Sequence, residues 1–154
     1  MRWLLLLCAL LICFAVASLG ARWTTPEIAA WYQTLVRPTF APPNWIFAPV
    51  WSMLYLLMAV AVWRVALLPS STLRTAALVL FCLQLLLNLC WSCIFFHWHQ
   101  IGMAFVEVLL LWVSIAATTL LFARLLPLAA WLMVPYLLWV SFASLLNFAY
   151  WRLN

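Results

Sequence analysis

The chain has 154 residues, of which 71% are hydrophobic, and its formally charged side chains at neutral pH are seven arginines and two glutamates. So few polar groups could not cover the surface of a water-soluble fold of this length, so the composition excludes that class and predicts a single integral membrane domain over residues 1–154. The net charge of +5 does not indicate nucleic-acid binding, because the arginines are scattered at the ends of apolar runs, where they suit lipid headgroups.

Residues 3–20 form the first predicted membrane span. Arg2, the apolar run that follows it and the small residues Ala15-Val16-Ala17 are also typical of a cleavable signal peptide. The apolar stretch continues to Ala21, which is long for a signal peptide and close to the length that a membrane-spanning helix needs. The pattern favours a retained helix, and the signal-peptide interpretation stays open.

Residues 21–42 are predicted to form a long loop rich in proline and aromatic residues. The run Thr24-Thr25-Pro26-Glu27 is typical of a helix start, and we expect a short helix from there to about Val36, lying at the membrane interface. The prolines that follow exclude helix. Because long structured loops are usually functional, we expect a lid over a binding site. The residues assigned to this lid are Trp31, Arg37, Pro42 and Pro43.

The second predicted span covers residues 43–66. Its prolines lie in the first turns, where a helix tolerates them because the first N–H groups have no partner within the helix. Trp51 and Tyr55 are four residues apart, so they lie on one face. We expect that face to line a cavity inside a helix bundle.

The third predicted span, residues 73–96, carries the clearest polar signal inside the membrane. Gln84, Asn88 and Trp91 are spaced by four and three residues and share one helix face. A carboxamide in hydrocarbon is costly without a partner, so this face should turn toward the bundle interior. A helix–helix hydrogen bond with no ligand role explains the same pattern. The opposite face is a candidate contact for lipid or a second copy of the chain and contains Cys82, Leu86, Leu89 and Cys93.

No metal site or catalytic residue is predicted. His97 and His99, in the loop after the third span, are two residues apart, and residues at that spacing do not share a helix face. The five cysteines lie inside apolar runs, match no metal motif and are interpreted as small hydrophobic side chains. The chain shows no nucleophile–base pair, no paired carboxylates and no phosphate-binding loop.

The fourth predicted span, residues 100–121, contains Glu107, the only acid expected inside the membrane. An unpaired carboxylate there would cost about 2.5–3.5 kcal/mol on insertion scales. Ser114 and Thr118 recur on the same stripe, so this face should turn inward. The pattern favours a structural role for Glu107 over a chemical one.

The fifth predicted span, residues 127–150, repeats the aromatic-plus-amide pattern of the third, and Pro135 should bend it by freeing the carbonyl of Trp131.

Three helices thus present aromatic rings and amides to one cavity, as the walls of small-molecule sites do. Flat rings favour a large, planar, mostly apolar guest. Arg37 is a candidate partner for an anionic edge of that guest, although reaching toward lipid headgroups explains it more simply. The residues assigned to ligand binding are Trp51, Tyr55, Asn88, Trp91, Tyr136, Trp139, Ala143 and Asn147.

Three blocks within about residues 28–154 carry a family resemblance: WY-x2-L-x-R-P-x3-PP-x-W-x-F-x-PVW-x2-LY, then Q-x3-N-x2-W-x3-FF, then PY-x2-W-x2-FA-x3-N-x4-RLN. Together they resemble the TspO/MBR family of tryptophan-rich sensory and translocator proteins, also known as peripheral-type benzodiazepine receptors. The resemblance implies an all-α membrane bundle of five helices with a short helix in the first loop, usually a homodimer, with the first helix retained. It also implies a receptor or binding protein for tetrapyrroles, with porphyrin or haem as ligand, and with sterols and synthetic ligands in some members, acting in sensing, sequestration or transport.

The resemblance places the family pocket and lid on many of the residues already assigned. Three positions depart from it: Ala41 replaces a lid histidine of animal members, Met103 replaces a pocket aromatic, and Phe148 replaces the tyrosine of the animal sterol motif. These departures argue against tight sterol and drug binding and affect tetrapyrrole binding less. The pocket positions are Trp51, Asn88, Trp91, Trp139, Ala143 and Asn147, and the lid positions are Trp31, Pro42 and Pro43.

Two other functions stay open. Some family members are proposed to degrade porphyrins in light and oxygen, which would make the pocket tryptophans redox partners of an enzyme. A lipid or metabolite transporter is the second alternative, although such proteins usually show more intramembrane charge and an inverted repeat. The arginines divide almost evenly between the two sides of the membrane, so they assign no orientation.

Overall fold

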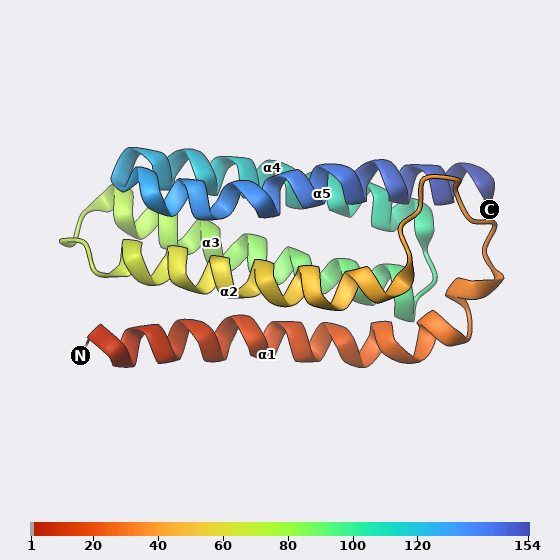
Figure 1. The fold of residues 1–154 in the computed structure, drawn as a ribbon. Helices are drawn as coiled ribbons and strands as arrows, with labels where there is room; N and C mark the ends of the chain where they lie inside the picture. Colours follow the sequence, from red (N-terminus) through yellow and green to blue (C-terminus); the bar gives the residue numbers. More distant parts are fainter. Residues whose placement is uncertain (1) are drawn as a thin grey trace.

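The computed structural model describes residues 2–154 and contains five long helices that run alternately up and down (Figure 1). All five are long and apolar enough to cross a membrane. The predicted all-α bundle of five spans is therefore confirmed. The helices are α1 (Arg2–Ala29), α2 (Phe47–Ala66), α3 (Thr72–Ser92), α4 (Ile101–Leu125) and α5 (Pro127–Leu153).

Helix α1 is longer than predicted, and the start at residue 24 expected for a separate short helix is wrong. Thr24 and Pro26 lie inside α1, and the Thr24 hydroxyl donates to a carbonyl four residues earlier in the same helix at 3.0 Å. Trp23 and Ile28 pack against a buried aromatic cluster. This tertiary contact offsets the single hydrogen bond that Pro26 removes, so the apparent start signal does not interrupt the helix.

The segment between α1 and α2 consists of turns and irregular backbone and contains two single-turn 3-10 helices, η1 (Tyr32–Thr34) and η2 (Asn44–Ile46). The short helix expected in this loop is therefore present as a 3-10 turn. The segment crosses the end of the bundle where the C-terminus lies (Figure 1). We call residues 30–46 the lid. It begins later than the predicted loop, 21–42, because α1 continues to Ala29, and it ends later because α2 begins at Phe47.

Helix α3 continues into a π-helical segment, η3 (Cys93–His97). Within this segment the consecutive residues Phe95 and Phe96 are both buried, and such π-helical turns are frequent at functional sites. His97, expected in the following loop, is the last residue of η3. His99 follows with a positive φ of 55°, a conformation that is uncommon for residues other than glycine.

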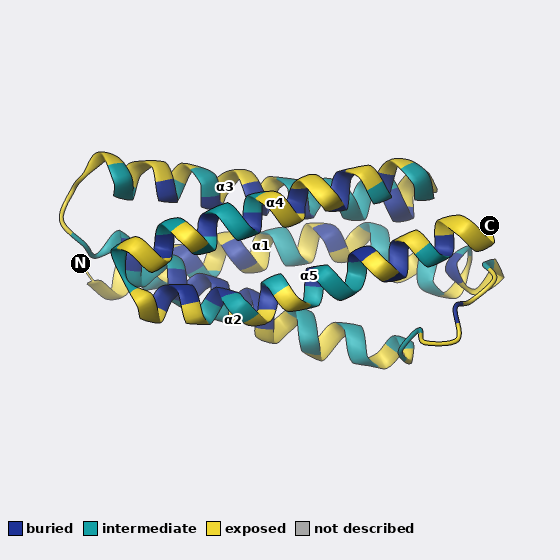
Figure 2. Ribbon diagram, turned by 90° about the horizontal axis from the view of Figure 1, so that it is seen from above, coloured by how far each residue is buried: buried dark blue, intermediate teal, exposed yellow. Residues whose placement is uncertain are grey.

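Buried residues gather on the faces that the helices turn toward one another, and exposed residues follow the outer faces (Figure 2). Helix α4 packs along α3 and α5, while α1 packs along α2 and α3. The polar residues Gln84, Asn88, Glu107 and Asn147 are all buried. The inward orientation predicted for these polar stripes is thus confirmed, as expected where lipid offers no hydrogen bonds.

The face of α3 suggested for a second copy of the chain points partly outward. Cys82 and Leu86 are exposed, and Leu89 and Cys93 are half-buried. An apolar exposed face of this kind suits lipid as well as a protein partner. The homodimer stays a prediction.

Substituting Phe122 with alanine should destabilise the bundle. Phe122 is fully buried in α4 and stacks on Phe81 of α3 with 6.1 Å between ring centroids. We expect a loss of up to about 3 kcal/mol, at the low end for such substitutions, because apolar atoms exposed to lipid lose packing but little transfer free energy. Thermal unfolding in detergent measures it. Leu120→Ala, at a position 66% exposed on the same helix, is the control, and an equal effect of both substitutions would contradict the packing.

Candidate ligand cavity

A cavity of about 430 Å³ lies inside the bundle beneath the lid. This volume falls in the range of small-molecule sites, about 300–1,000 Å³. Helices α1, α2, α3 and α5 supply most of the wall, Val108 and Leu111 of α4 close one side, and Tyr32 and Asn44 of the lid close the end. Its aromatic lining residues are Phe14, Tyr32, Phe47, Trp51, Tyr55, Trp91, Phe95, Phe96, Trp139 and Tyr150.

The structure brings most of the residues assigned to ligand binding to this one cavity. Tyr136 is the exception: it is fully buried behind Trp51, with 6.1 Å between the two ring centroids. Its helical spacing predicts the correct face of α5 but not its depth in the packing. The assigned residues that line the cavity are Trp51, Tyr55, Asn88, Trp91, Trp139, Ala143 and Asn147. Ligand binding by these residues stays a prediction.

Asn88 links three helices through its side-chain amide. The Tyr55 hydroxyl of α2 donates to Asn88 Oδ1 at 2.5 Å, and Asn88 Nδ2 donates to the Tyr136 hydroxyl of α5 at 3.0 Å. An amide buried in hydrocarbon must find such partners within the protein. The contact therefore sets the position of both tyrosines.

Asn147 makes a second link of the same kind. The Trp91 indole N–H of α3 donates to Asn147 Oδ1 at 3.0 Å, and Asn147 Nδ2 donates to the carbonyl oxygen of Ile101, at the start of α4, at 3.0 Å. Both amides that were expected to face a ligand are thus engaged with protein groups. Their role in this structure is to orient the aromatic walls.

Two indole N–H groups remain for a ligand. Trp51 and Trp139 both line the cavity, and their N–H groups donate to no atom within residues 2–154, in contrast to that of Trp91. Indole nitrogen donates hydrogen bonds and accepts none. The walls of the cavity therefore include flat indole rings with two free N–H donors, which suit a guest that carries acceptor atoms at its edge.

Helix α1 forms a wall that the sequence interpretation missed. Its lining residues include Phe14, Ala17, Ala21 and Ile28, which follow one another at intervals of three to seven residues on one helix face. The signal in the sequence is a stripe of mostly small residues, and neither the single aromatic ring of Phe14 nor the small hydroxyl side chains of this stripe distinguish it from an ordinary membrane span. The small side chains leave the space that the cavity occupies.

Tyr32 was also missed, although it directly follows Trp31 in the first family block. It is 9% exposed, and its ring contacts Phe95, Phe96 and Tyr150 at centroid distances of 6.2, 5.8 and 5.1 Å. Burial first, and then the neighbouring Tyr150 hydroxyl, raise the pKa of Tyr32 above its ordinary value. The phenol therefore stays neutral at physiological pH and closes the cavity as an uncharged group.

The four residues assigned to the lid do not line the cavity; they shape and anchor the lid. The Arg37 guanidinium donates to the carbonyl oxygens of Ala41 and Pro42, so it braces the lid internally. Trp31 stacks on His99, with 4.1 Å between ring centroids, and His99 Nε2 lies 3.0 Å from Glu27 Oε2. These contacts join the end of α1 and the start of the lid to the loop before α4.

The side-chain amide of Asn154 holds the middle of the lid. The Val36 backbone N–H donates to Asn154 Oδ1 at 2.8 Å, and Asn154 Nδ2 donates to the Val36 carbonyl oxygen at 3.2 Å. The amide thus pairs with Val36 as a neighbouring strand would. The same Nδ2 atom also donates to the Tyr150 carbonyl oxygen at 3.0 Å, which fixes the lid to α5.

Within residues 2–154, two buried polar side chains have no hydrogen-bond partner, and single buried atoms of the half-buried Asn44 (Oδ1) and Arg74 (Nε) also have none. The two buried side chains are Gln84 of α3, through both amide atoms, and Glu107 of α4, through both carboxyl oxygens. Neither lines the cavity, although Glu107 precedes the lining residue Val108. Unpartnered polar groups in a buried site cost free energy, so neither contributes to stability as Asn88 does.

Comparison with known proteins gives consistent matches over nearly the whole chain. The sequence model of the TspO/MBR family matches residues 9–152. The tryptophan-rich protein TspO of Chlorobaculum tepidum is 44% identical over 147 residues, which cover 93% of this chain and 91% of that protein. Protein CrtK of Rhodobacter capsulatus is 38% identical, covering 91% and 88%. The human translocator protein is 39% identical, covering 88% and 81%.

Replacing Asn88 and Gln84 with leucine should give opposite results. Asn88→Leu leaves the Tyr55 and Tyr136 hydroxyls without their hydrogen-bond partner. We therefore expect the free energy of unfolding to fall by about 1–2 kcal/mol, as for other interhelical hydrogen bonds in membranes. Gln84→Leu removes two unpartnered polar atoms at nearly constant volume, so it should be neutral or stabilising. Thermal unfolding of the two variants in detergent checks this, and equal destabilisation would count against the hydrogen-bond assignment.

Replacing Asn154 should loosen the lid in a way that depends on the new side chain. Asn154→Ala removes the acceptor of the Val36 N–H, so the Val36 amide should exchange hydrogen for deuterium faster, by roughly tenfold if the bond contributes about 1.4 kcal/mol. Asn154→Asp keeps an acceptor oxygen at that place and should retain most of the protection. Hydrogen exchange followed by mass spectrometry measures both, and an unchanged rate in the alanine variant would disprove the clamp.

Proposed function

The chain belongs to the TspO/MBR family and is an integral membrane protein, and we propose that it binds a tetrapyrrole such as porphyrin or haem, or a similar planar apolar molecule, in the cavity beneath the lid. The proposal rests on the cavity of about 430 Å³, which is lined by indole rings from three helices: Trp51 of α2, Trp91 of α3 and Trp139 of α5. Binding of this kind would serve sensing, sequestration or transport of the ligand.

The walls of the cavity supply two kinds of contact for such a ligand, aromatic stacking and hydrogen bonds. Aromatic rings stack on a planar guest, and each such pair contributes about 0.5–1.5 kcal/mol beyond the area that it buries. The N–H groups of Trp51 and Trp139 can donate to carboxylate or carbonyl oxygens at the edge of the guest. The amides of Asn88 and Asn147 act indirectly, because they hold the tyrosine and tryptophan rings in place.

Protoporphyrin is the first ligand to test. The double variant Trp51→Ala plus Trp139→Ala should bind it more weakly by roughly 5- to 150-fold, because two stacking contacts of about 0.5–1.5 kcal/mol each are lost. Titration in the dark under nitrogen, followed through the absorbance of the porphyrin itself, gives the dissociation constant. Trp131→Ala is the matched control, since Trp131 lies on α5 and is 71% exposed.

Equal affinity in the double variant and in the Trp131→Ala control would refute the cavity as the binding site. Repeating the titration in light and air separates binding from degradation. A binding protein leaves the porphyrin spectrum intact, whereas loss of the spectrum that requires light, oxygen and the native cavity would favour the enzyme alternative.

A further inference from the structure

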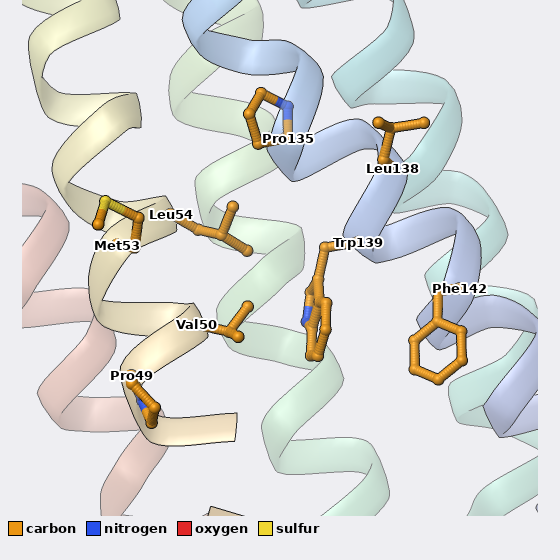
Figure 3. A pocket seen from close by; sticks show the side chains of 8 residues that line it. All are labelled: Pro49, Val50, Met53, Leu54, Pro135, Leu138, Trp139 and Phe142. Atoms are coloured by element: carbon orange, nitrogen blue, oxygen red, sulfur yellow. The ribbon is translucent and has the colours of Figure 1, made fainter. Parts of the chain in front are cut away.

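A second hollow of about 560 Å³ opens on the outer surface between α2 and α5 (Figure 3). All its lining residues are apolar or aromatic, and they include Pro49 and Met53 of α2 and Pro135, Leu138 and Phe142 of α5. Both helices are membrane spans, so this groove faces the hydrocarbon of the bilayer. We call it the α2–α5 groove.

Trp139 is the residue shared by the groove and the inner cavity; among the described residues no other lines both. Its ring extends from α5 into the gap between α5 and α2, with α3 behind it (Figure 3). On the α2 side, Val50 lines the groove and its neighbour Trp51 lines the cavity. The Trp139 indole is therefore the partition between the lipid-facing groove and the cavity.

This partition is not fixed by hydrogen bonds. The Trp139 ring contacts Phe47 and Phe142, at centroid distances of 5.9 and 5.6 Å, and its N–H has no partner within residues 2–154. Trp91, in contrast, is held by Asn147 at 3.0 Å. Pro135, one turn before Trp139, has no N–H to donate within α5, which makes that turn easier to bend.

The other end of the cavity is closed by polar contacts. The lid is anchored through the pairing of Asn154 with Val36 and through Trp31, which stacks on His99, a residue that in turn contacts Glu27 of α1. A mostly apolar molecule partitions into the bilayer, and reaching the cavity through the lid would require it to enter water first, which is unfavourable. A path through the groove avoids that step.

We propose that the α2–α5 groove is a lateral entrance: it holds a hydrocarbon chain or another apolar group from the bilayer, and rotation of the Trp139 ring connects it to the cavity. The identity of the molecule that finally occupies the cavity rests on the proposed function, but the route does not. A lipid chain tests the route without any porphyrin.

Photocrosslinking with a phosphatidylcholine that carries a diazirine in one acyl chain tests the gate directly. In vesicles, the unchanged protein should give adducts on groove residues such as Met53 and Leu138. Trp139→Ala removes the partition, so adducts should extend to the cavity residues Trp51 and Ala143. Met53→Ala is the control, with Leu138 as its groove readout, because it enlarges the groove from the α2 side and removes none of the ring contacts of Trp139. Adducts that stay confined to the groove in Trp139→Ala would overturn the proposal.

Filling the groove supplies a second test that does not alter the cavity. Leu138→Trp places a large ring in the groove, whereas Leu145→Trp adds the same ring at a similarly exposed position of α5 outside it; the two leucines are 64% and 65% exposed. Protoporphyrin delivered from preloaded vesicles should bind Leu138→Trp roughly tenfold more slowly than the control, with a similar dissociation constant, because only the path is obstructed.

The two measurements separate the two proposals. Equal association rates in Leu138→Trp and Leu145→Trp would overturn the lateral entrance while leaving the cavity intact as a binding site. Absence of protoporphyrin binding to the unchanged protein would overturn the proposed ligand, and the crosslinking result would still decide the entrance.

Discussion

The structure depends on one constraint: lipid offers no hydrogen bonds, so a polar side chain in hydrocarbon stabilises the bundle only where the protein itself supplies its partners. Asn88 meets it by joining Tyr55 of α2 to Tyr136 of α5. Asn147 meets it by joining Trp91 of α3 to the start of α4. Since most of the remaining contacts between helices are non-directional, these two amides fix which aromatic rings face one another and so define the cavity.

The two kinds of polar group in this arrangement, side-chain amides and indole N–H groups, have different roles. The amides are engaged with the protein and hold the walls, while the indole N–H groups of Trp51 and Trp139 remain available to a guest. The rings of Tyr55 and Trp91 are preorganised in this way, because the amides already hold them before a planar molecule binds. The recognition that we propose therefore rests on shape and stacking, with few directional contacts.

The cavity has two boundaries of opposite chemistry. The lid is closed by amide, guanidinium and imidazole contacts, including those of Arg37 and Asn154, and it faces the membrane surface. The α2–α5 groove lies between two membrane spans, and among the described residues Trp139 is the one that lines both the groove and the cavity. A protein whose guest dissolves in the bilayer can thus keep its polar closure intact and still exchange that guest, which connects the proposed binding site to the proposed entrance.

Hydropathy and helical spacing are properties of a single segment. The membrane class, the five spans and the inward faces could therefore be predicted from the amino-acid sequence. The aromatic and amide residues on one face of α2, α3 and α5 could be predicted for the same reason. Only the tertiary structure decided which helices meet: that α1 continues past Pro26 to pack on the aromatic cluster, that its small residues form a wall, and that Tyr136 lies behind Trp51. The physical reason is that spacing assigns a side chain to a face, whereas its depth and its partner depend on packing between segments far apart in the chain.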